Sequence, residues 1–479
     1  MNYSMIRYTL GWLLLFESAF FALPLVCSLI YSDGALSAFF FSMLICAALG
    51  CLMVIRKPKK TGFYAKEGFV IVSLSWIFLS ILGAMPFMFS GVTGSYVDAL
   101  FETASGFTTT GATIFTEVEW LPESILLWRS FTHWVGGMGV LVFIMAFLPL
   151  SGGHNMHIMR AESPGPEVSK LVPKVRNTAL ILYGIYFILT LIQFVSLMLA
   201  GMSAFDALNT SFSTAGTGGF GVKNDSLASA SPAQQIIVTV FMLIFSVNFN
   251  SYYLVLKCKF KDAFNTEVRV FFGIVIAAVA IITFNVFSSS DYFRDIGEAI
   301  RHVAFTVSSI ISTTGFTTTN FDIWPSLSRT IILLLMFVGA CAGSTGGGLK
   351  CSRVIILIKG MFRELRTIIH PRQVKKITID SRPVEHEVLR SVNAYIVTFI
   401  TVFICSLLII SFDNHDLVTS FSSVAATINN VGPGLGEAYS NFTVFSPLSK
   451  LVFIFDMLAG RLELFPMLIL FSPLTYKKT

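Results

Sequence analysis

Four short polar strips rich in glycine, threonine and asparagine recur along an otherwise apolar sequence, and their backbone could bind a cation. Each strip follows an apolar, helix-like stretch of roughly three turns. Glycine permits backbone angles that turn successive carbonyl groups toward one axis, and rings of carbonyl oxygens can replace the hydration shell of a cation. The four segments are VDALFETASGFTTTGAT (97–113), FDALNTSFSTAGTGGFG (205–221), IRHVAFTVSSIISTTGFTTTNF (300–321) and HDLVTSFSSVAATINNVGPGLG (415–436).

The four segments form an internal repeat. One glycine of each strip aligns with one glycine of the others, and a proline follows each where the next apolar run begins. The aligned glycines are Gly111, Gly218, Gly315 and Gly432, and the prolines are Pro122, Pro232, Pro325 and Pro447. The period, 97 to 117 residues, is long for a solenoid. It suits four copies of a unit made of a helix, a pore loop and a second helix.

The composition indicates what positions these strips. The 479 residues are 54% hydrophobic and only 13% charged, which is far too apolar for an ordinary soluble domain. Ten apolar runs are long enough to cross a bilayer core of ~30 Å. They lie near 9–31, 35–55, 68–90, 125–149, 178–201, 235–256, 270–289, 328–358, 392–412 and 447–472.

The expected fold is an all-α polytopic membrane protein with ten transmembrane helices. Eight of them belong to four helix, pore loop and helix repeats around a pseudo-fourfold pore, and an N-terminal helix pair stands outside the repeat. The predicted boundaries are 1–66 for the N-terminal two-helix domain and 67–165, 166–265, 266–385 and 386–479 for pore repeats 1 to 4. Non-helical backbone at membrane depth is tolerated only where it is buried in protein or lines a water-filled cavity, so the strips should share an aqueous axis.

The distribution of charge predicts the orientation. Most of the 33 Lys and Arg residues lie at the termini or in and beside four loops, 56–60, 160–176, 257–269 and 350–390. By the positive-inside rule these faces are cytoplasmic, which places both termini in the cytoplasm. The net charge of +6 is then topological, and no nucleic-acid partner is expected. Seven scattered cysteines without a CxxC pair predict neither a disulfide framework nor a metal site.

A second glycine-rich run, GACAGSTGGGLK (339–350), interrupts the long apolar run 328–358. It is no phosphate-binding loop, because Leu349 separates Gly348 from Lys350. Its small residues should interrupt the helix and leave backbone N–H and C=O groups that must be buried in protein or line a water-filled cavity. A close helix-packing patch is the alternative.

Three further features leave alternatives open. Arg461 lies inside an apolar run, where a charge usually faces the bundle interior; it acts on the pore or pairs with Glu463 or Asp456. His133 is either a proton relay or a packed side chain. Acidic residues expected outside either concentrate cations at the mouth or form a solvated face, and they are Glu117, Glu119, Glu123, Asp225, Asp322 and Glu437.

The four strips, GACAGSTGGGLK and AGRLELF (459–465) resemble the Trk/Ktr/HKT superfamily of potassium transporters. The resemblance covers the whole chain and is greatest to the bacterial Trk-system membrane subunits, because of the extra N-terminal helix pair. It implies four filters that bind potassium through backbone carbonyls, and no other metal or cofactor. The implied filter residues are Thr109, Thr110, Gly111, Gly216, Thr217, Gly218, Thr313, Thr314, Gly315, Asn430, Val431 and Gly432. The implied gate is an intramembrane loop with Arg461, and the loop residues are Gly343, Ser344, Thr345, Gly346, Gly347 and Gly348.

The same resemblance implies the function and the partners. A glycine at every aligned filter position resembles the potassium-permeable members, because serine at the first goes with sodium preference in plant relatives. The expected function is potassium uptake across the inner or plasma membrane through a gated channel-like pore, and a proton- or sodium-coupled potassium symporter is the alternative. No enzyme active site is indicated. Expected partners are the lipid bilayer, a second copy in a homodimer, and a cytoplasmic TrkA-like ring of nucleotide-binding RCK domains. The basic segment from Arg353 to Arg390 is a docking surface for that ring, a dimer element or a contact with lipid headgroups.

Overall fold

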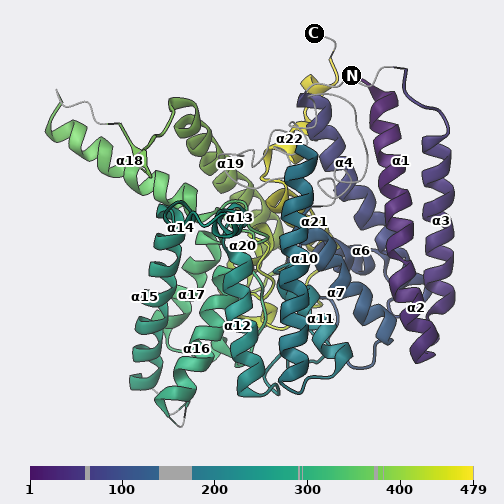
Figure 1. Cartoon of the computed structure of the whole chain (residues 1–479), viewed down its shortest axis with the longest axis horizontal. Coiled ribbons are helices and arrows are strands. Elements are labelled where there is room, and N and C mark those ends of the chain that lie inside the picture. Colours follow the sequence, from purple (N-terminus) through teal and green to yellow (C-terminus); the bar gives the residue numbers. More distant parts are fainter. Residues whose placement is uncertain are drawn as a thin grey trace.

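A computed structural model of the chain describes residues 1–59, 65–139, 175–289, 292–293, 295–371, 376–380 and 382–477. In these ranges the chain is mostly helical (Figure 1). Six helical segments are long and apolar enough to cross a membrane. They are Tyr3–Tyr31 (α1, Tyr3–Phe20, with α2, Ala22–Tyr31), α3 (Leu36–Val54), Lys66–Phe89 (α4, Ala65–Gly83, with α5, Met85–Phe89), Asn177–Leu199 in α10 (Val175–Leu199), α15 (Thr266–Ser289) and His386–Asp413 (α19, His386–Ile410, with η2, Ser411–Asp413).

The helices after the four strips are shorter than the sequence predicts. They begin at or directly after the predicted prolines and are α7 (Glu123–Gly137), α12 (Pro232–Ser246), α17 (Ser326–Val338) and α21 (Pro447–Arg461). The runs 235–256 and 447–472 are therefore not single continuous helices, whereas 328–358 is interrupted at its glycine-rich run 339–350, as the sequence predicts. Residues 140–149 of the predicted run 125–149 lie outside the described residues. A count of ten spans stays a prediction.

Backbone conformation explains where these helices end. Val247 is extended and is followed by α13 (Phe249–Leu256) at an angle of 92° to α12. Gly339, at φ +66°, ends α17, and Glu463 and Leu464, at φ +59° and +63°, separate α21 from α22 (Phe465–Phe471). A left-handed residue cannot continue a right-handed helix, so the chain turns at each of these points.

Four short helices precede the polar strips. They are α6 (Tyr96–Phe107), α11 (Ala204–Ala215), α16 (Ile296–Ile311) and α20 (Leu417–Ile428). Each begins with a side chain that accepts a hydrogen bond from a first-turn N–H group, which satisfies an otherwise unpaired donor. These N-cap residues are Ser95, Ser203, Asp295 and Asp416.

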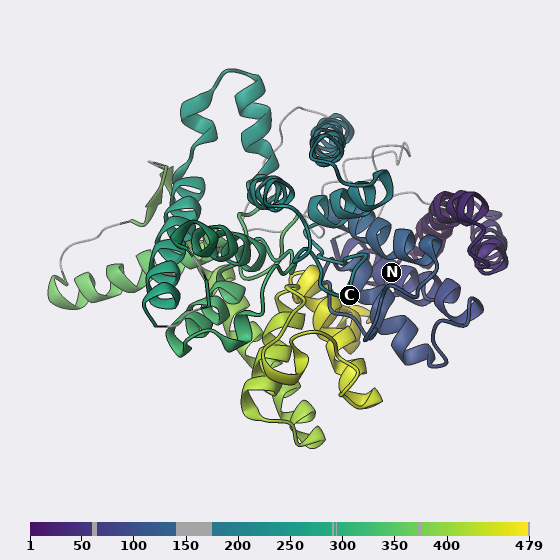
Figure 2. The ribbon, with the colours of Figure 1, turned by 90° about the horizontal axis from the view of Figure 1, so that it is seen from below.

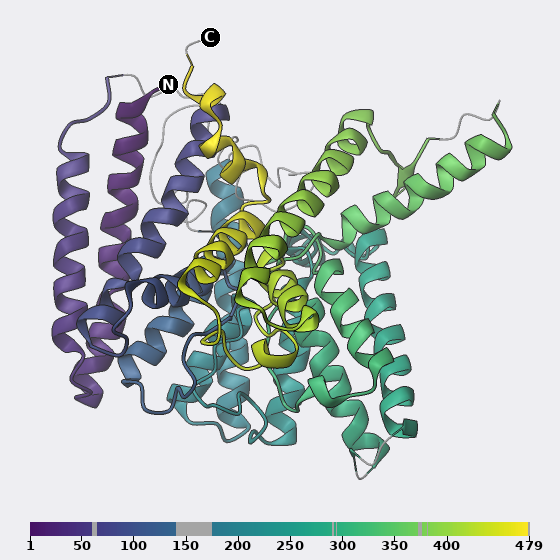
Figure 3. The same ribbon diagram turned by 180° about the vertical axis from the view of Figure 1, so that it is seen from behind.

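The helices before and after the strips pack in a closed cycle. Each short helix contacts the helix that follows it, in the pairs α6 with α7, α11 with α12, α16 with α17 and α20 with α21. Each following helix contacts the next short helix, in the pairs α7 with α11, α12 with α16, α17 with α20 and α21 with α6. Viewed from below, the four units follow one another around a common centre (Figure 2). The fourth unit, in yellow, lies between the first and the third (Figure 3).

The remaining elements lie around this cycle. The N-terminal helices pack on the first unit, because α1 contacts α4 and α2 contacts α7. Helix α18 (Cys351–Ile369) runs away from the bundle at the end of the molecule that also carries both termini (Figure 1). The smaller elements are α14 (Phe260–Ala263), the 3-10 turns Phe321–Ile323, Gly436–Ala438 and Pro473–Thr475, and the antiparallel strands β1 (Thr378–Ile379) and β2 (Arg382–Pro383).

Candidate ion-binding site

All four short helices end in the same backbone motif. The first residue of each strip is left-handed, with φ between 54° and 60°, and its N–H group bonds to the carbonyl three residues back; these residues are Thr109, Thr217, Thr313 and Asn430. The next N–H group bonds to the carbonyl five residues back, at 2.8 to 2.9 Å. Such paired bonds satisfy the last carbonyls of a helix and turn the chain sharply. The strips therefore leave their helices in one common geometry.

This geometry corrects the alignment of the second strip by one residue. A glycine with positive φ follows two residues after each left-handed residue, and the four are Gly111, Gly219, Gly315 and Gly432. Gly219, at φ +83°, is thus the equivalent of Gly315, and Gly218 is not. The predicted set Gly216, Thr217 and Gly218 shifts to Thr217, Gly218 and Gly219, because Gly216 is still the C-cap of α11.

The sequence carries a signal for the correct register. A phenylalanine follows both Gly219 and Gly315. In both cases its carbonyl accepts a hydrogen bond from the hydroxyl of a serine seven residues earlier in the chain. Ser213 Oγ donates to Phe220 O at 2.8 Å, and Ser309 Oγ donates to Phe316 O at 2.6 Å. Alignment on the Gly-Phe pair gives the register that the structure has.

The four glycines close a ring with the residues that precede them. A Cβ atom on Gly111 would lie 1.9 Å from Gly218 O, one on Gly219 would lie 2.0 Å from Thr314 O, one on Gly315 would lie 2.4 Å from Val431 O, and one on Gly432 would lie 2.6 Å from Thr110 O. Real Cβ atoms do not approach other atoms this closely, so each glycine is required by the carbonyl of the next strip. We call Thr110, Gly218, Thr314 and Val431 the carbonyl ring.

A cavity of about 140 Å³ lies against this ring, and all four glycines line it. Its charged lining residues are Arg129 and Lys223, so none of the six predicted acidic residues lines it within the described chain. Glu119, Glu123 and Asp225 instead line a separate cavity of about 770 Å³, which Lys223 also borders. Any steering of cations by these carboxylates acts from outside the smaller cavity.

The predicted gate residues Gly343 to Gly348 lie in the loop between α17 and α18, against the first residues of the strips. Gly347 N donates to Thr313 Oγ1 at 2.6 Å, and Gly348 N donates to Asn429 O at 3.0 Å. A Cβ atom on Gly347 would lie 2.4 Å from Asn429 O. The loop is therefore in tight contact with the third and fourth strips.

Arg461 connects the same loop to the first unit. Its Nη1 donates to Thr345 O at 2.8 Å and to Thr109 Oγ1 at 3.4 Å, and its Nη2 donates to Gly136 O and Gly137 O. Glu463 forms its ion pair with Arg353, and Asp456 accepts from Ser406 Oγ at 2.7 Å. Both acids that the sequence offered as partners of Arg461 thus bind other side chains.

The C-terminal carbonyl groups of α7 and α12 accept hydrogen bonds from Arg461 and from residues of the loop between α17 and α18. Carbonyls at a helix C-terminus lack partners within the helix and carry partial negative charge. Arg461 satisfies those of α7, while Cys341 N and Thr345 Oγ1 bond to Ser246 O and Phe245 O at the end of α12. Lys350, which is buried, donates to Gly346 O within the loop.

His133 lies between the first two strips as a packed, hydrogen-bonded side chain. Its Nδ1 lies 2.9 Å from Gly106 O, and its Nε2 lies 3.3 Å from Phe220 N. A neutral ring with the proton on Nδ1 satisfies both contacts, and its face contacts Phe220 with 4.3 Å between ring centroids. This geometry favours the packing role over a proton relay.

Replacing His133 with alanine is expected to lower stability and leave the pH dependence of transport unchanged. The change leaves the buried Phe220 N–H group without its partner, which costs about 1–3 kcal/mol. It also removes one of the two hydrogen bonds to Gly106 O, which still accepts from Thr109 N. Thermal unfolding of the detergent-solubilised protein measures the first effect, and flux between pH 6 and 8 measures the second. A transport optimum that moves with pH would instead support the relay.

Comparisons with known proteins agree with this architecture. The family model described as "TrkH: Cation transport protein" matches residues 35–476. The chain is 37% identical to the Trk system potassium uptake protein TrkH of Escherichia coli K12, with all of both chains covered. It is 34% identical to the Trk system potassium uptake protein TrkG of the same strain, with 94% of this chain and 93% of that protein covered.

A solved structure is also similar over the whole chain. The crystal structure of the potassium transporter TrkH from Vibrio parahaemolyticus superposes with a TM-score of 0.90 at 33% identity, and it covers 100% of both chains. With the matched family model and the full-length identity above, this protein belongs to the TrkH family of cation transport proteins.

Proposed function

We propose that this protein takes up potassium across the cell membrane through a gated, channel-like pore. The observation that carries the proposal is the closed cycle of four strips, in which each glycine packs on a carbonyl of the next strip. A ring of backbone carbonyls suits a dehydrated monovalent cation. The relatives named as potassium uptake proteins support potassium as that cation.

In the corrected register the filter consists of the left-handed residue, the carbonyl-ring residue and the glycine of each strip. These are Thr109, Thr110 and Gly111; Thr217, Gly218 and Gly219; Thr313, Thr314 and Gly315; and Asn430, Val431 and Gly432. The backbone supplies the ligands, so a valine or a threonine serves equally in the carbonyl ring. The four short helices direct their partially negative C-terminal ends toward the site.

The loop Gly343 to Gly348 and Arg461 form the gate in this proposal. The loop is held against two strips by its own N–H groups and is tied to a third by the guanidinium of Arg461. A cation fixed beside the filter also opposes the passage of potassium. This arrangement suits a closed pore that opens when the loop withdraws.

The proposal also includes a membrane topology, a homodimer and a cytoplasmic partner. Ten spans in the domains 1–66, 67–165, 166–265, 266–385 and 386–479 would place both termini and α18 in the cytoplasm. Helix α18 exposes apolar residues, and in this proposal a second copy of the chain packs against them in a homodimer. These residues are Ile358, Met361, Phe362, Leu365, Ile368 and Ile369. The proposed docking surface for a TrkA-like nucleotide-binding ring is the basic segment 353–390, in which Arg366, Lys376 and Arg390 are exposed, whereas Arg353 is buried.

Potassium uptake by cells tests the function. The protein is expressed together with its TrkA-type subunit in bacteria that lack their own potassium uptake systems. We expect growth at low external potassium and uptake of rubidium as a tracer, neither of which occurs with an empty vector. Protein that reaches the membrane but supports neither would contradict the proposal.

A further inference from the structure

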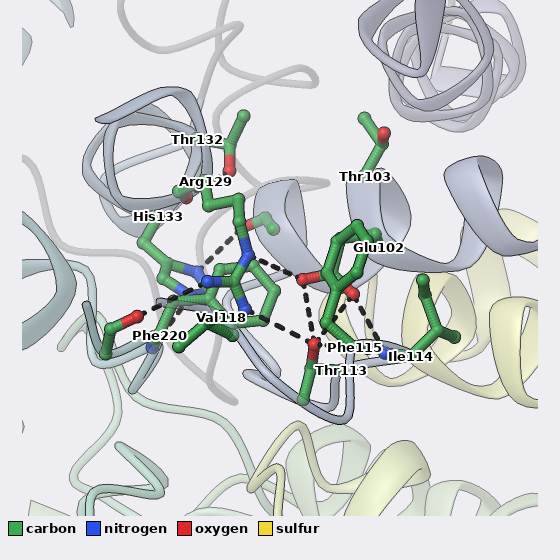
Figure 4. Close-up of polar contacts among 12 residues, drawn as sticks. Glu102, Thr103, Thr113, Ile114, Phe115, Val118, Arg129, Thr132, His133 and Phe220 are labelled. Atoms are coloured by element: carbon green, nitrogen blue, oxygen red, sulfur yellow. Dashed lines mark hydrogen bonds and ion pairs between the residues drawn. The ribbon is translucent and has the colours of Figure 1, made fainter. Parts of the chain in front are cut away.

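A buried ion pair joins the first two strips next to the filter (Figure 4). Arg129 Nε lies 2.7 Å from Glu102 Oε1, and the two side chains are 2% and 0% exposed. Glu102 belongs to α6 and Arg129 to α7, so both come from the first unit. A buried ion pair is costly to desolvate and is only weak evidence for stability, which makes its other contacts informative.

Each member of the pair is bonded to backbone or hydroxyl groups of a strip. Glu102 Oε2 accepts from Ile114 N and from Thr113 Oγ1, both at 3.0 Å. Arg129 Nη2 donates to Thr113 Oγ1 at 3.3 Å, and Nη1 donates to Gly221 O at 3.3 Å. The guanidinium carbon also lies 4.2 Å from the centroid of the Phe220 ring. The guanidinium thus bonds to Glu102 through Nε, to the second strip through Nη1 and to Thr113 of the first strip through Nη2.

Thr113 and Gly221, to which the ion pair bonds, occupy equivalent positions of the first and second strips in the corrected register. Thr113 lies two residues after Gly111, and Gly221 lies two residues after Gly219. A Cβ atom added to Gly111 would lie 1.9 Å from Gly218 O, the shortest of the four such distances in the ring. A movement of Thr113 or Gly221 therefore changes the position of Gly218 O relative to the first strip.

The other junctions between strips are held differently in the described chain. Thr317 N, two residues after Gly315, donates to Ser226 Oγ at 3.2 Å, and Tyr439 Oη donates to Thr319 O at 2.9 Å. Phe442 N donates to Thr113 O at 2.8 Å and joins the fourth strip to the first. These are neutral hydrogen bonds. Among these junctions in the described chain, the one between the first and second strips is bridged by a buried charged pair that bonds to both strips.

We propose that Glu102 and Arg129 are positioning residues for ion selectivity, which set the spacing of the carbonyl ring between the first and second strips. This inference rests on the proposed filter. Neither side chain needs to bind the ion. Arg129 lines the cavity of about 140 Å³, but Glu102 compensates its charge, so the pair presents little net charge to a cation.

The test uses two variants of the full-length protein in planar bilayers. Arg129→Lys keeps the positive charge but removes the planar guanidinium group, whose three nitrogens bond to Glu102, Thr113 and Gly221 at the same time. Glu102→Gln with Arg129→Met removes both charges and leaves no unpaired buried charge. We expect each to lower the potassium to sodium permeability ratio by about tenfold, the lower end of what loss of an outer-shell partner costs a metal site.

A second ion pair on the same helix provides the matched control. Lys450 Nζ lies 2.7 Å from Asp98 Oδ1, one turn before Glu102 on α6. Asp98→Asn with Lys450→Met should leave the permeability ratio unchanged, because neither residue bonds to a strip in the contacts described.

Two results would overturn the inference. One is an unchanged ratio in a folded Glu102→Gln and Arg129→Met variant. The other is an unchanged ratio in Arg129→Lys while the charge-free variant changes, which would assign the effect to charge alone. If the charge-free variant does not fold, the permeability ratio of Arg129→Lys alone tests the inference, and an unchanged ratio overturns it. If Gly315→Ser changes the ratio and these variants do not, the filter stands and only this inference fails.

Discussion

Replacing Gly315 with serine is expected to lower the potassium to sodium permeability ratio by about tenfold or more, which corresponds to ~1.4 kcal/mol of lost discrimination. The added Cβ atom would lie 2.4 Å from Val431 O and 3.0 Å from Pro433 Cδ. Val431 is a carbonyl-ring residue, so the fourth strip must move to accommodate the side chain. Bi-ionic reversal potentials in bilayers measure the ratio.

Gly201→Ser is the control for backbone strain. Gly201 has φ +84°, almost the same as the +85° of Gly315, but nothing lies within 4 Å of its added Cβ atom. Both variants therefore carry the strain of a left-handed serine, and only Gly315→Ser disturbs the ring. Equal ratios in Gly315→Ser and the wild type would contradict the filter assignment.

Replacing Arg461 with alanine is expected to raise potassium flux by about tenfold, because a hydrogen bond from a charged group contributes about 1.5–3 kcal/mol. The change removes the bond to Thr345 O and thereby one tie that holds the loop in place. It also removes a fixed positive charge beside the filter. Flux of potassium into liposomes and single-channel conductance measure the effect.

Lys450→Ala is the control for this prediction, because Lys450 lies on the same helix, α21, and pairs with Asp98 away from the loop. Deletion of residues 343 to 347 should change flux in the same direction as Arg461→Ala. If Arg461→Ala lowers expression but leaves the conductance of the folded protein unaltered, Arg461 is structural and the gate assignment fails.

The sequence predicts the units because their chemistry is local. A polar side chain starts each short helix, a polar strip that contains glycine follows its end, and a proline such as Pro122 or Pro232 starts the next helix. These signals need no knowledge of distant contacts. The placement of four units of similar composition in one chain was therefore accessible from spacing alone.

The register and the helix ends depend on contacts that spacing does not contain. Residues 218 and 219 are both glycines, so spacing alone does not fix the register; the Gly-Phe pair indicates it, and the φ of Gly219 and the proximity of Thr314 O establish it. Apolar sequence continues through Val247, so hydropathy predicts a single span where the helix bends by 92°. The pairing of Arg129 with Glu102 joins residues that are 27 positions apart, so the spacing of the strips does not reveal it.

The reversal potential of the purified wild-type protein under opposed potassium, sodium and proton gradients tests the central claim most directly. A selective pore lined by the carbonyl ring predicts a current that reverses near the potassium equilibrium potential and does not shift when the proton or sodium gradient is inverted. A reversal potential that follows the proton or sodium gradient would contradict the pore and support coupled symport.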